Sequence, residues 1–116
     1  MCIRDRFCKI ARKEIPAAVV YEDDTLLAFK DINPQAPVHL LLIPKAHCEN
    51  LNDLTPATAE AAARIPGVAA QLARDHGVAE AGWRLTTNCG VEGGQGVYHL
   101  HFHVIGGKPL GSRVCR

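Results

Sequence analysis

Near its C-terminal end the chain contains Tyr98-His99-Leu100-His101-Phe102-His103-Val104-Ile105, and this stretch decides the fold prediction. Successive side chains of a β-strand point to opposite faces, so the three histidines are predicted to share one face. The other face is apolar and rich in strand-forming residues, which predicts a half-buried strand. Half of the six histidines of the protein lie within five residues, so an accidental surface cluster is a poor explanation.

Length and composition indicate a single domain with one hydrophobic core. The chain has 116 residues and a formal net charge of +1, which excludes a broad basic surface for DNA or RNA. No apolar run reaches membrane-spanning length and no signal peptide is recognised, so we expect a cytoplasmic protein without nucleic-acid or membrane partners. The five cysteines are irregularly spaced, which favours free thiols over a disulfide framework.

Hydrophobic periodicity in the first half of the chain predicts one short helix and three strands. Residues 7–14 have a weak helical period that Ile15-Pro16 ends, and strands are expected at 19–22, 25–30 and 39–43. The last of these is a continuous apolar run, which is typical of a central strand with both faces covered.

The second half predicts one long helix and two strands. Thr55-Pro56 combines a hydroxyl N-cap with proline at the first helical position. The helix should end near Gly77, with a kink or break at Pro66-Gly67. A strand at 83–88 and a glycine-rich loop at 90–96 lead into the histidine strand. Strands interrupted by a helix in this way predict an α+β fold with an antiparallel sheet.

Three explanations compete for the histidine strand, and two of them are weaker. Histidine on the polar face by chance is disfavoured, because Thr or Val would suit a sheet better. A metal site is possible in principle, since histidines two apart on a strand can converge on zinc. His39, His47 and the cysteines could supply its other ligands.

Phosphate chemistry is the third explanation and the one that the residues favour. The glycine-rich loop can turn backbone N–H groups toward an anion. A neutral imidazole held through one ring nitrogen is a competent nucleophile at the other, and flanking imidazoles can hold phosphoryl oxygens. The loop and the three histidines together therefore predict a site that acts on a phosphate.

The stretch His99–Ile105 matches the signature of the histidine triad (HIT) family, in which histidine alternates with hydrophobic residues. Further matches lie at residues 15–17, 21–24, 29–39, 43–45, 93–95 and 106–108. Together they resemble the nucleotide-binding HINT branch of the family over roughly residues 7 to 111. The resemblance implies a five-stranded antiparallel sheet with one long and one short helix, and a homodimer.

The same resemblance implies an activity. HINT-like proteins hydrolyse nucleoside 5′-phosphoramidates, here expected to be conjugates of purine nucleoside monophosphates, through a nucleotidyl-histidine intermediate and without a metal cofactor. Three alternatives stay open: a dinucleoside polyphosphate hydrolase, a nucleotide-binding or regulatory module with little turnover, and a zinc-binding regulatory protein.

Residue by residue, the resemblance makes His101 the nucleophile that attacks the α-phosphorus. His103 and His99 would flank the phosphate, and His39 would complete the cluster of imidazoles. Asp31 matches the acidic residue that holds the ribose hydroxyls, since the two oxygens of a carboxylate can accept from both hydroxyls. Positions near the phosphate match Asn88, Gln95, Gly96 and Val97. Candidates for an apolar wall against the base are Ile32, Phe29 and Leu42.

The chain departs from the family pattern at a metal site. Many bacterial relatives carry Cys-x-x-Cys and bind structural zinc together with two histidines, which match His47 and His99. Here Asp5 stands where the partner of Cys8 would be. Because this ligand set is incomplete, the sequence predicts no bound metal. Without a metal, Cys8 is expected to act as a small buried hydrophobic residue.

The termini and one loop residue also depart from the pattern. Residues 1–6 are expected to be a non-native or disordered leader, 7–111 the HIT domain, and 112–116 an irregular tail in place of the family's tryptophan-proline ending. Gly96 replaces a serine that helps to protonate an amine leaving group in some relatives. That proton would then come from His103 or from water.

Overall fold

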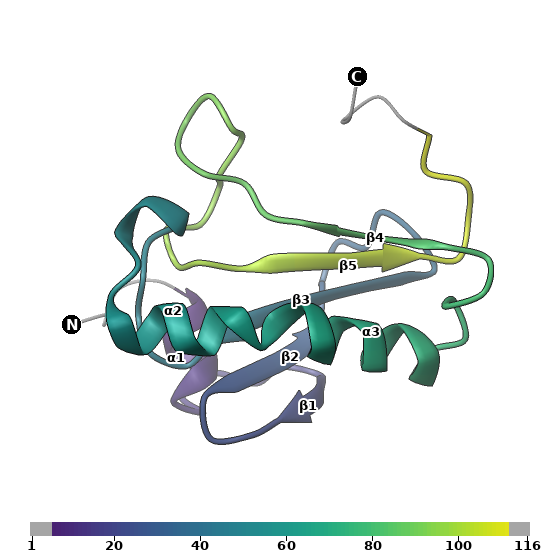
Figure 1. The fold of residues 1–116 in the computed structure, drawn as a ribbon. Helices are drawn as coiled ribbons and strands as arrows, with labels where there is room; N and C mark the ends of the chain where they lie inside the picture. Colours follow the sequence, from purple (N-terminus) through teal and green to yellow (C-terminus); the bar gives the residue numbers. More distant parts are fainter. Residues whose placement is uncertain (1–5, 112–116) are drawn as a thin grey trace.

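The structure, a computed structural model, describes residues 6–111. Of the predicted leader, only Arg6 lies inside this range, where it begins a helix, and the predicted tail lies outside it. Along the chain the helices and strands follow the predicted order (Figure 1). Their bounds are α1 Arg6–Ala11, β1 Val19–Glu22, β2 Leu26–Lys30, β3 Val38–Pro44, the 3-10 helix Leu51–Asp53, α2 Pro56–Ala63, α3 Ile65–Asp75, β4 Trp83–Thr86 and β5 Phe102–Gly106.

The five strands form one antiparallel sheet in the order β1-β2-β3-β5-β4. This confirms the predicted α+β fold with a five-stranded antiparallel sheet. β3 is the central strand, and it is buried along almost its whole length. A central strand must cover both faces, which explains why its sequence is a continuous apolar run rather than an alternating one.

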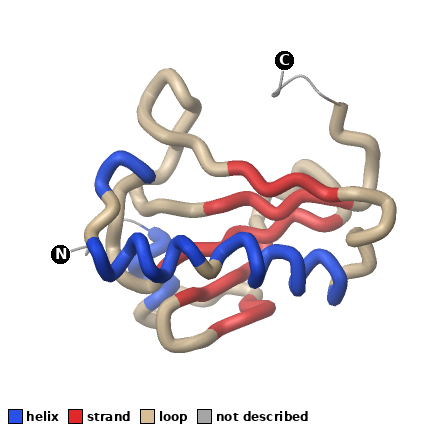
Figure 2. Tube along the Cα trace, in the orientation of Figure 1, coloured by secondary structure: helices blue, strands red, loops and turns tan. Residues whose placement is uncertain are grey.

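The two faces of β3 pack against different helices. Leu40 and Leu42 point into a core shared with Ile65 and Leu72 of the long helical segment. Leu41 belongs to the opposite core, together with Phe7 of α1. The helices α2 and α3 therefore cover one face of the sheet and α1 covers part of the other (Figures 1 and 2).

The predicted long helix is bent, as Pro66-Gly67 indicated. α2 begins with Thr55 at the N-cap, in a reciprocal capping box with Thr58, and ends at Ala63. α3 begins at Ile65, so the break falls just before Pro66, whose ring cannot be accommodated in an uninterrupted helix. Arg64, at the break, bonds through its guanidinium to both carboxylate oxygens of Asp23 in the β1–β2 turn. This ion pair attaches the bend to the sheet.

The histidine strand is shorter than predicted. β5 begins at Phe102, so His99 and His101 precede it in an irregular segment outside the sheet ladder. The reason is that the carbonyl of His101 accepts from the Thr87 hydroxyl at 2.7 Å instead of from a neighbouring strand. For the same reason β4 ends at Thr86 rather than at residue 88. Tyr98, expected on the buried face, is exposed.

The segment between β4 and β5 extends beyond the sheet as a long loop (Figure 2). Its backbone needs glycine at two kinds of position. Gly90 and Gly94 have positive φ, and a Cβ on Gly93 would overlap the carbonyl oxygen of Cys89. Within residues 6–111, no helix combines the length and the apolar character that crossing a membrane requires.

Candidate active site

Three of the predicted site residues form a continuous chain of contacts. Asp31 follows β2, His39 lies in β3, and His103 lies in β5, the strand that pairs with β3. His39 Nε2 lies 2.9 Å from His103 Nδ1 and 3.3 Å from Asp31 Oδ2. Antiparallel pairing of β3 with β5 brings these side chains together on the face that α2 and α3 leave uncovered, opposite to Leu40 and Val104.

A backbone amide determines which ring nitrogens of His39 and His103 carry a proton. The N–H of Gln35 donates to His39 Nδ1 at 2.9 Å, so Nδ1 must carry the lone pair and the neutral ring must carry its proton on Nε2. The Nε2–H of His39 faces His103 Nδ1, which therefore accepts this hydrogen bond. The proton of the neutral His103 ring must then lie on Nε2 of His103. The sequence contained no signal for the role of Gln35, because it acts through its backbone.

His101 is held in the opposite tautomer. Its Nδ1 lies 2.8 Å from the carbonyl oxygen of His99, and since a carbonyl only accepts, Nδ1 carries the proton and Nε2 the lone pair. The ring packs edge-on against Phe7 at a centroid distance of 5.0 Å and against His103 at 5.1 Å. A ring fixed at one nitrogen with a lone pair at the other is the arrangement that a nucleophilic imidazole requires.

The imidazoles of this cluster are neutral at neutral pH. Burial lowers the pKa of His101 and of His39, and the charge of Asp31 opposes the shift in both. The pKa of His103 is lowered to about 4, chiefly by burial and then by repulsion from the rings of His101 and His39 when these are charged. A neutral His101 keeps its lone pair available for attack.

An apolar cavity adjoins Asp31. It has a volume of about 380 Å³ and is lined by Ile10, Ile15, Pro16, Ala17, Ala18, Phe29, Lys30, Asp31, Ile32 and Leu41. This volume is within the range of small-molecule sites. Two of the three predicted wall residues, Phe29 and Ile32, line it. Leu42 does not, because it points into the core beneath α2 and α3, and its neighbour Leu41 takes the place.

The ring of His99 lies outside the cluster formed by the rings of His39, His101 and His103. It is completely buried, with Nδ1 3.1 Å from Cys8 Sγ and Nε2 2.8 Å from the carbonyl oxygen of Pro44. With both ring nitrogens engaged, the ring cannot flank a phosphate as the sequence predicted. His99 contributes to the site through its carbonyl oxygen, which orients His101.

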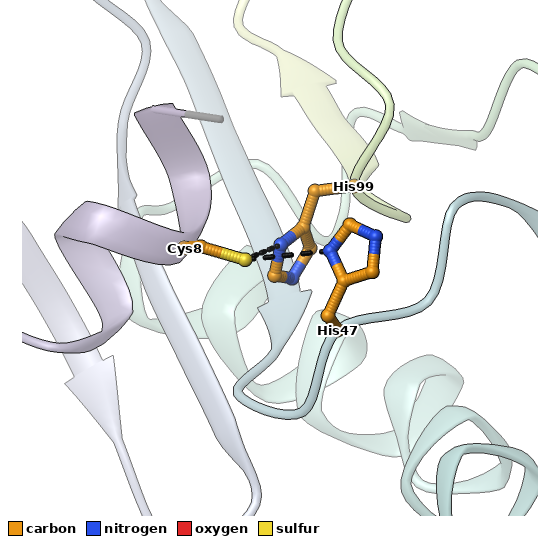
Figure 3. A group of neighbouring side chains, drawn as sticks. All are labelled: Cys8, His47 and His99. Atoms are coloured by element: carbon orange, nitrogen blue, oxygen red, sulfur yellow. Dashed lines mark hydrogen bonds between the residues drawn. The ribbon is translucent and has the colours of Figure 1, made fainter. Parts of the chain in front are cut away.

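His99 belongs to a second cluster, in which the side chains of Cys8, His47 and His99 converge (Figure 3). Cys8 Sγ lies 3.3 Å from His47 Nδ1, and the three ligand atoms are within 4.8 Å of one another. A tetrahedral zinc ion with bonds of about 2.0–2.3 Å needs ligands about 3.3–3.8 Å apart. Nε2 of His99 also donates its N–H to a carbonyl, as the ring nitrogen not bound to the metal usually does in metal-bound histidines.

The spacing of these three side chains suits a partial zinc ligand set, in which both histidines would bind through Nδ1. Cys8, however, is disulfide-bonded, which corrects the expectation of a free thiol at this position. Its sulfur could therefore bind a metal as thiolate only after that bond is reduced. Asp5, at the position of the fourth ligand, lies outside the described residues. The absence of a bound metal stays a prediction. The group Asp31, His39 and His103 is also close enough to hold a cation. It suits one poorly, because the Gln35 amide keeps the proton on His39 Nε2.

The glycine-rich loop is organised by Gln95, which is buried. Its Oε1 accepts from Asn50 Nδ2 and from the Gly90 amide, and its Nε2 donates to the carbonyls of Glu49 and Val97. All four hydrogen-bonding positions of the side chain are thus used within the protein, and none is left for a nucleotide. Gln95 shapes the loop, and reasoning from the sequence missed its partner Asn50.

The other predicted phosphate-loop residues are spread along the same segment. Gly96 is exposed, and Val97 packs against the core beneath α1. Asn88 is half-buried and follows Thr87, whose hydroxyl bonds to His101. Within residues 6–111 its side chain forms no hydrogen bond, so contact of these three residues with a ligand stays a prediction.

Comparison with known proteins decides the family. A family model described as the HIT domain matches residues 12–110. The purine nucleoside phosphoramidase of Escherichia coli strain K12 is 49% identical over 109 residues, which cover 94% of this chain and 92% of that protein. The chain belongs to the HIT family.

Solved structures agree with this assignment. A HIT family hydrolase from Legionella pneumophila Philadelphia 1 has a TM-score of 0.88 and 49% identity, covering 93% of this chain and 96% of that chain. A histidine triad protein from Clostridium difficile has a TM-score of 0.90 and 43% identity, covering 96% of each chain. The predicted HIT fold and the predicted enzyme of the hydrolase class are both confirmed.

Proposed function

We propose that this HIT protein hydrolyses purine nucleoside 5′-phosphoramidates through a nucleotide bound covalently to His101. The observation that carries the proposal is the fixed tautomer of His101. Its Nδ1 proton is held by the His99 carbonyl at 2.8 Å, which leaves the Nε2 lone pair for the phosphorus. The similarity to a purine nucleoside phosphoramidase at 49% identity supports the choice of substrate.

The reaction takes two displacements at phosphorus. The lone pair of His101 Nε2 attacks the α-phosphorus, and the P–N bond breaks with its electron pair going to the amine. The amine takes a proton from Nε2 of His103 or from water, since Gly96 carries no hydroxyl. Water then attacks the phosphorus, the bond to His101 breaks, and a proton of that water replaces the one that the amine took from His103 or from the solvent, which releases a nucleoside monophosphate.

Recognition of the nucleoside follows from the position of Asp31. This carboxylate borders both the apolar cavity and the chain of imidazoles. Ribose hydroxyls held by Asp31 would direct the base into the cavity, against Phe29 and Ile32, and the phosphate toward the histidines. The 73% exposure of Ile32 leaves apolar surface for the base to cover.

Trapping the intermediate tests the proposal. The protein is mixed with adenosine 5′-phosphoramidate, quenched within a turnover and digested with trypsin. The tryptic peptide of residues 85–113 carries all three histidines of the triad, since trypsin does not cleave between Lys108 and Pro109, so fragmentation spectra must locate one adenylyl group on His101. An adduct on another residue, or none while hydrolysis proceeds, would overturn the assignment. Competition with diadenosine polyphosphates then separates the phosphoramidase from the alternative activity.

The proposal includes a homodimer in the cytoplasm with no nucleic-acid or membrane partner. Among the described strands β4 is at the edge of the sheet, with β5 as its neighbour on one side. An unpaired strand edge favours pairing with another chain, so the two sheets would join across a two-fold axis. Sedimentation equilibrium should then give twice the mass of the chain.

A further inference from the structure

One proton in the site faces two acceptors. The single proton on His39 Nε2 lies toward His103 Nδ1 at 2.9 Å and toward Asp31 Oδ2 at 3.3 Å. The other nitrogen of His39 accepts from the Gln35 amide, so the ring cannot offer a second proton to satisfy both acceptors. The side chain of His39 is almost completely buried, which keeps water from completing the set.

Asp31 is the acceptor that a ligand can occupy. Its Oδ1 already accepts from the Asn33 amide at 2.8 Å, which orients the carboxylate. Its Oδ2 faces His39 and belongs to the residue that lines the open cavity. A donor arriving from that cavity would therefore compete with His39 for the same oxygen.

We propose that ribose hydroxyls bound to Asp31 free the His39 Nε2–H to donate its hydrogen bond to His103 alone, so that recognition of the sugar prepares the imidazoles for the chemical step. This inference rests on the proposed function and deepens it. With Asp31 occupied, His39 Nε2–H donates to His103 alone, which fixes His103 with its own Nε2–H available to the amine. Asp31 thus acts as a positioning residue through His39, in addition to holding the ribose.

Coupling through His39 and simple binding of the ribose predict effects on different kinetic steps. A carboxylate that only holds the ribose makes the same contact before and during reaction, so loss of the hydroxyls would raise KM alone. Coupling through His39 predicts that loss of the hydroxyls also slows the transfer of the nucleotide to His101. The hydroxyls lie at the sugar, remote from the bond that breaks.

A two-by-two kinetic comparison tests the coupling. The substrates are adenosine 5′-phosphoramidate and its 2′,3′-dideoxy analogue, and the measured quantity is the single-turnover rate constant at saturation. In the unmodified protein the analogue should react about tenfold more slowly, the effect of one hydrogen bond to a charged group. Equal rate constants for the two substrates would overturn the proposal.

The variant for this comparison is Asp31→Asn, which keeps an oxygen for the Asn33 amide and turns an N–H toward His39. His39 then has His103 as its remaining acceptor, so the two substrates should react at rates within about twofold of each other. Asp24→Asn, an exposed carboxylate in the β1–β2 turn, is the matched control and should retain the tenfold difference. A tenfold difference that persists in Asp31→Asn would overturn the proposal.

A measurement without turnover separates the inference from the activity. Nitrogen NMR of histidine-labelled protein reports the protonation of each ring, and adenosine has no phosphate to transfer. Adenosine should shift the His39 Nε2 and His103 Nδ1 resonances, and 2′,3′-dideoxyadenosine bound in the same cavity should not. If adenosine binds without these shifts, the coupling is wrong while phosphoramidate hydrolysis still stands. If the shifts occur but no nucleotide reaches His101, the proposed function fails and the coupling stands.

Discussion

Two histidines that stand two residues apart are held in opposite tautomers. His99 donates from Nε2 to the Pro44 carbonyl and directs its Nδ1 at Cys8, in a completely buried cluster. His101 donates from Nδ1 to the His99 carbonyl and keeps its lone pair on Nε2. The same side chain in the same alternating pattern therefore acts in a structural contact at one position and presents a nucleophile at the other. The carbonyl partner of each ring decides between them.

The largest expected effect comes from removing the nucleophile. His101→Ala should lower kcat for adenosine 5′-phosphoramidate by about 10⁴-fold or more, since no other group can form the covalent intermediate. Affinity for adenosine monophosphate, measured by calorimetry, should stay close to normal. Near-normal hydrolysis by this variant would show that His101 and His99 do not divide the chemical and structural roles in this way.

Removing the neighbouring ring should affect stability instead. His99→Ala empties a completely buried site and leaves the Pro44 carbonyl without its donor. We expect the free energy of unfolding to fall by about 3 kcal/mol, measured by urea denaturation. Because the His99 carbonyl remains, kcat per folded molecule should change by less than about tenfold. A loss of turnover equal to that of His101→Ala, in a fully folded protein, would contradict this.

Acid should affect the catalytic cluster through its protonation. The pKa of His103 is lowered to about 4 and that of His101 is also lowered, so both rings stay neutral at neutral pH. The rate should be flat above pH 6.5 and fall below it as the rings take up protons.

Stability should follow the same direction. An unfolded chain binds protons at the ordinary histidine pKa of about 6.5, so it takes up more protons than the folded chain between pH 6.5 and about 4. The free energy of unfolding should therefore decrease as the pH falls through this window. His103→Gln should make that decrease shallower, and an unchanged slope would show that protonation of His103 is not its cause.

Chelation should have the smallest effect on activity. The proposed chemistry uses neutral imidazoles and no metal, so treatment with a strong chelator should leave kcat unchanged within about twofold. Any effect should be confined to the melting temperature, through the cluster of Cys8, His47 and His99. A large loss of kcat that added zinc restores would show that the two clusters are not independent.

The features that could be predicted from the sequence are those that local pattern determines. Alternation predicted that His99, His101 and His103 share one face, and the rings of His101 and His103 do pack against each other. Pro66 predicted the bend in the long helix. The role of His99 could not be predicted, because its ring is engaged by Cys8, 91 positions away along the chain. Gln35 acts through an amide that every non-proline residue has, so its identity carries no signal.

The direction of the Gln95 side chain could not be predicted for a third reason. The resemblance placed it near the phosphate, and its position along the loop agrees with that. Whether its side chain points outward or inward depends on Asn50 and on the carbonyl of Glu49, which arrive from a distant part of the chain. A local pattern cannot specify which way a polar side chain in an irregular loop turns.

The two-sided burial of β3 has a practical consequence for engineering this protein. Leu40 and Leu42 contact the helical layer, whereas His39 and Leu41 face the cavity and the imidazoles. Substitutions that improve packing on the first side can raise thermal resistance while the reactive groups stay in register. Changes on the second side can broaden or narrow the range of accepted compounds, but Leu41 also packs in the core with Phe7, so they must keep the volume of that core. One seven-residue strand thus has a side that governs robustness alone and a side that governs selectivity and robustness together.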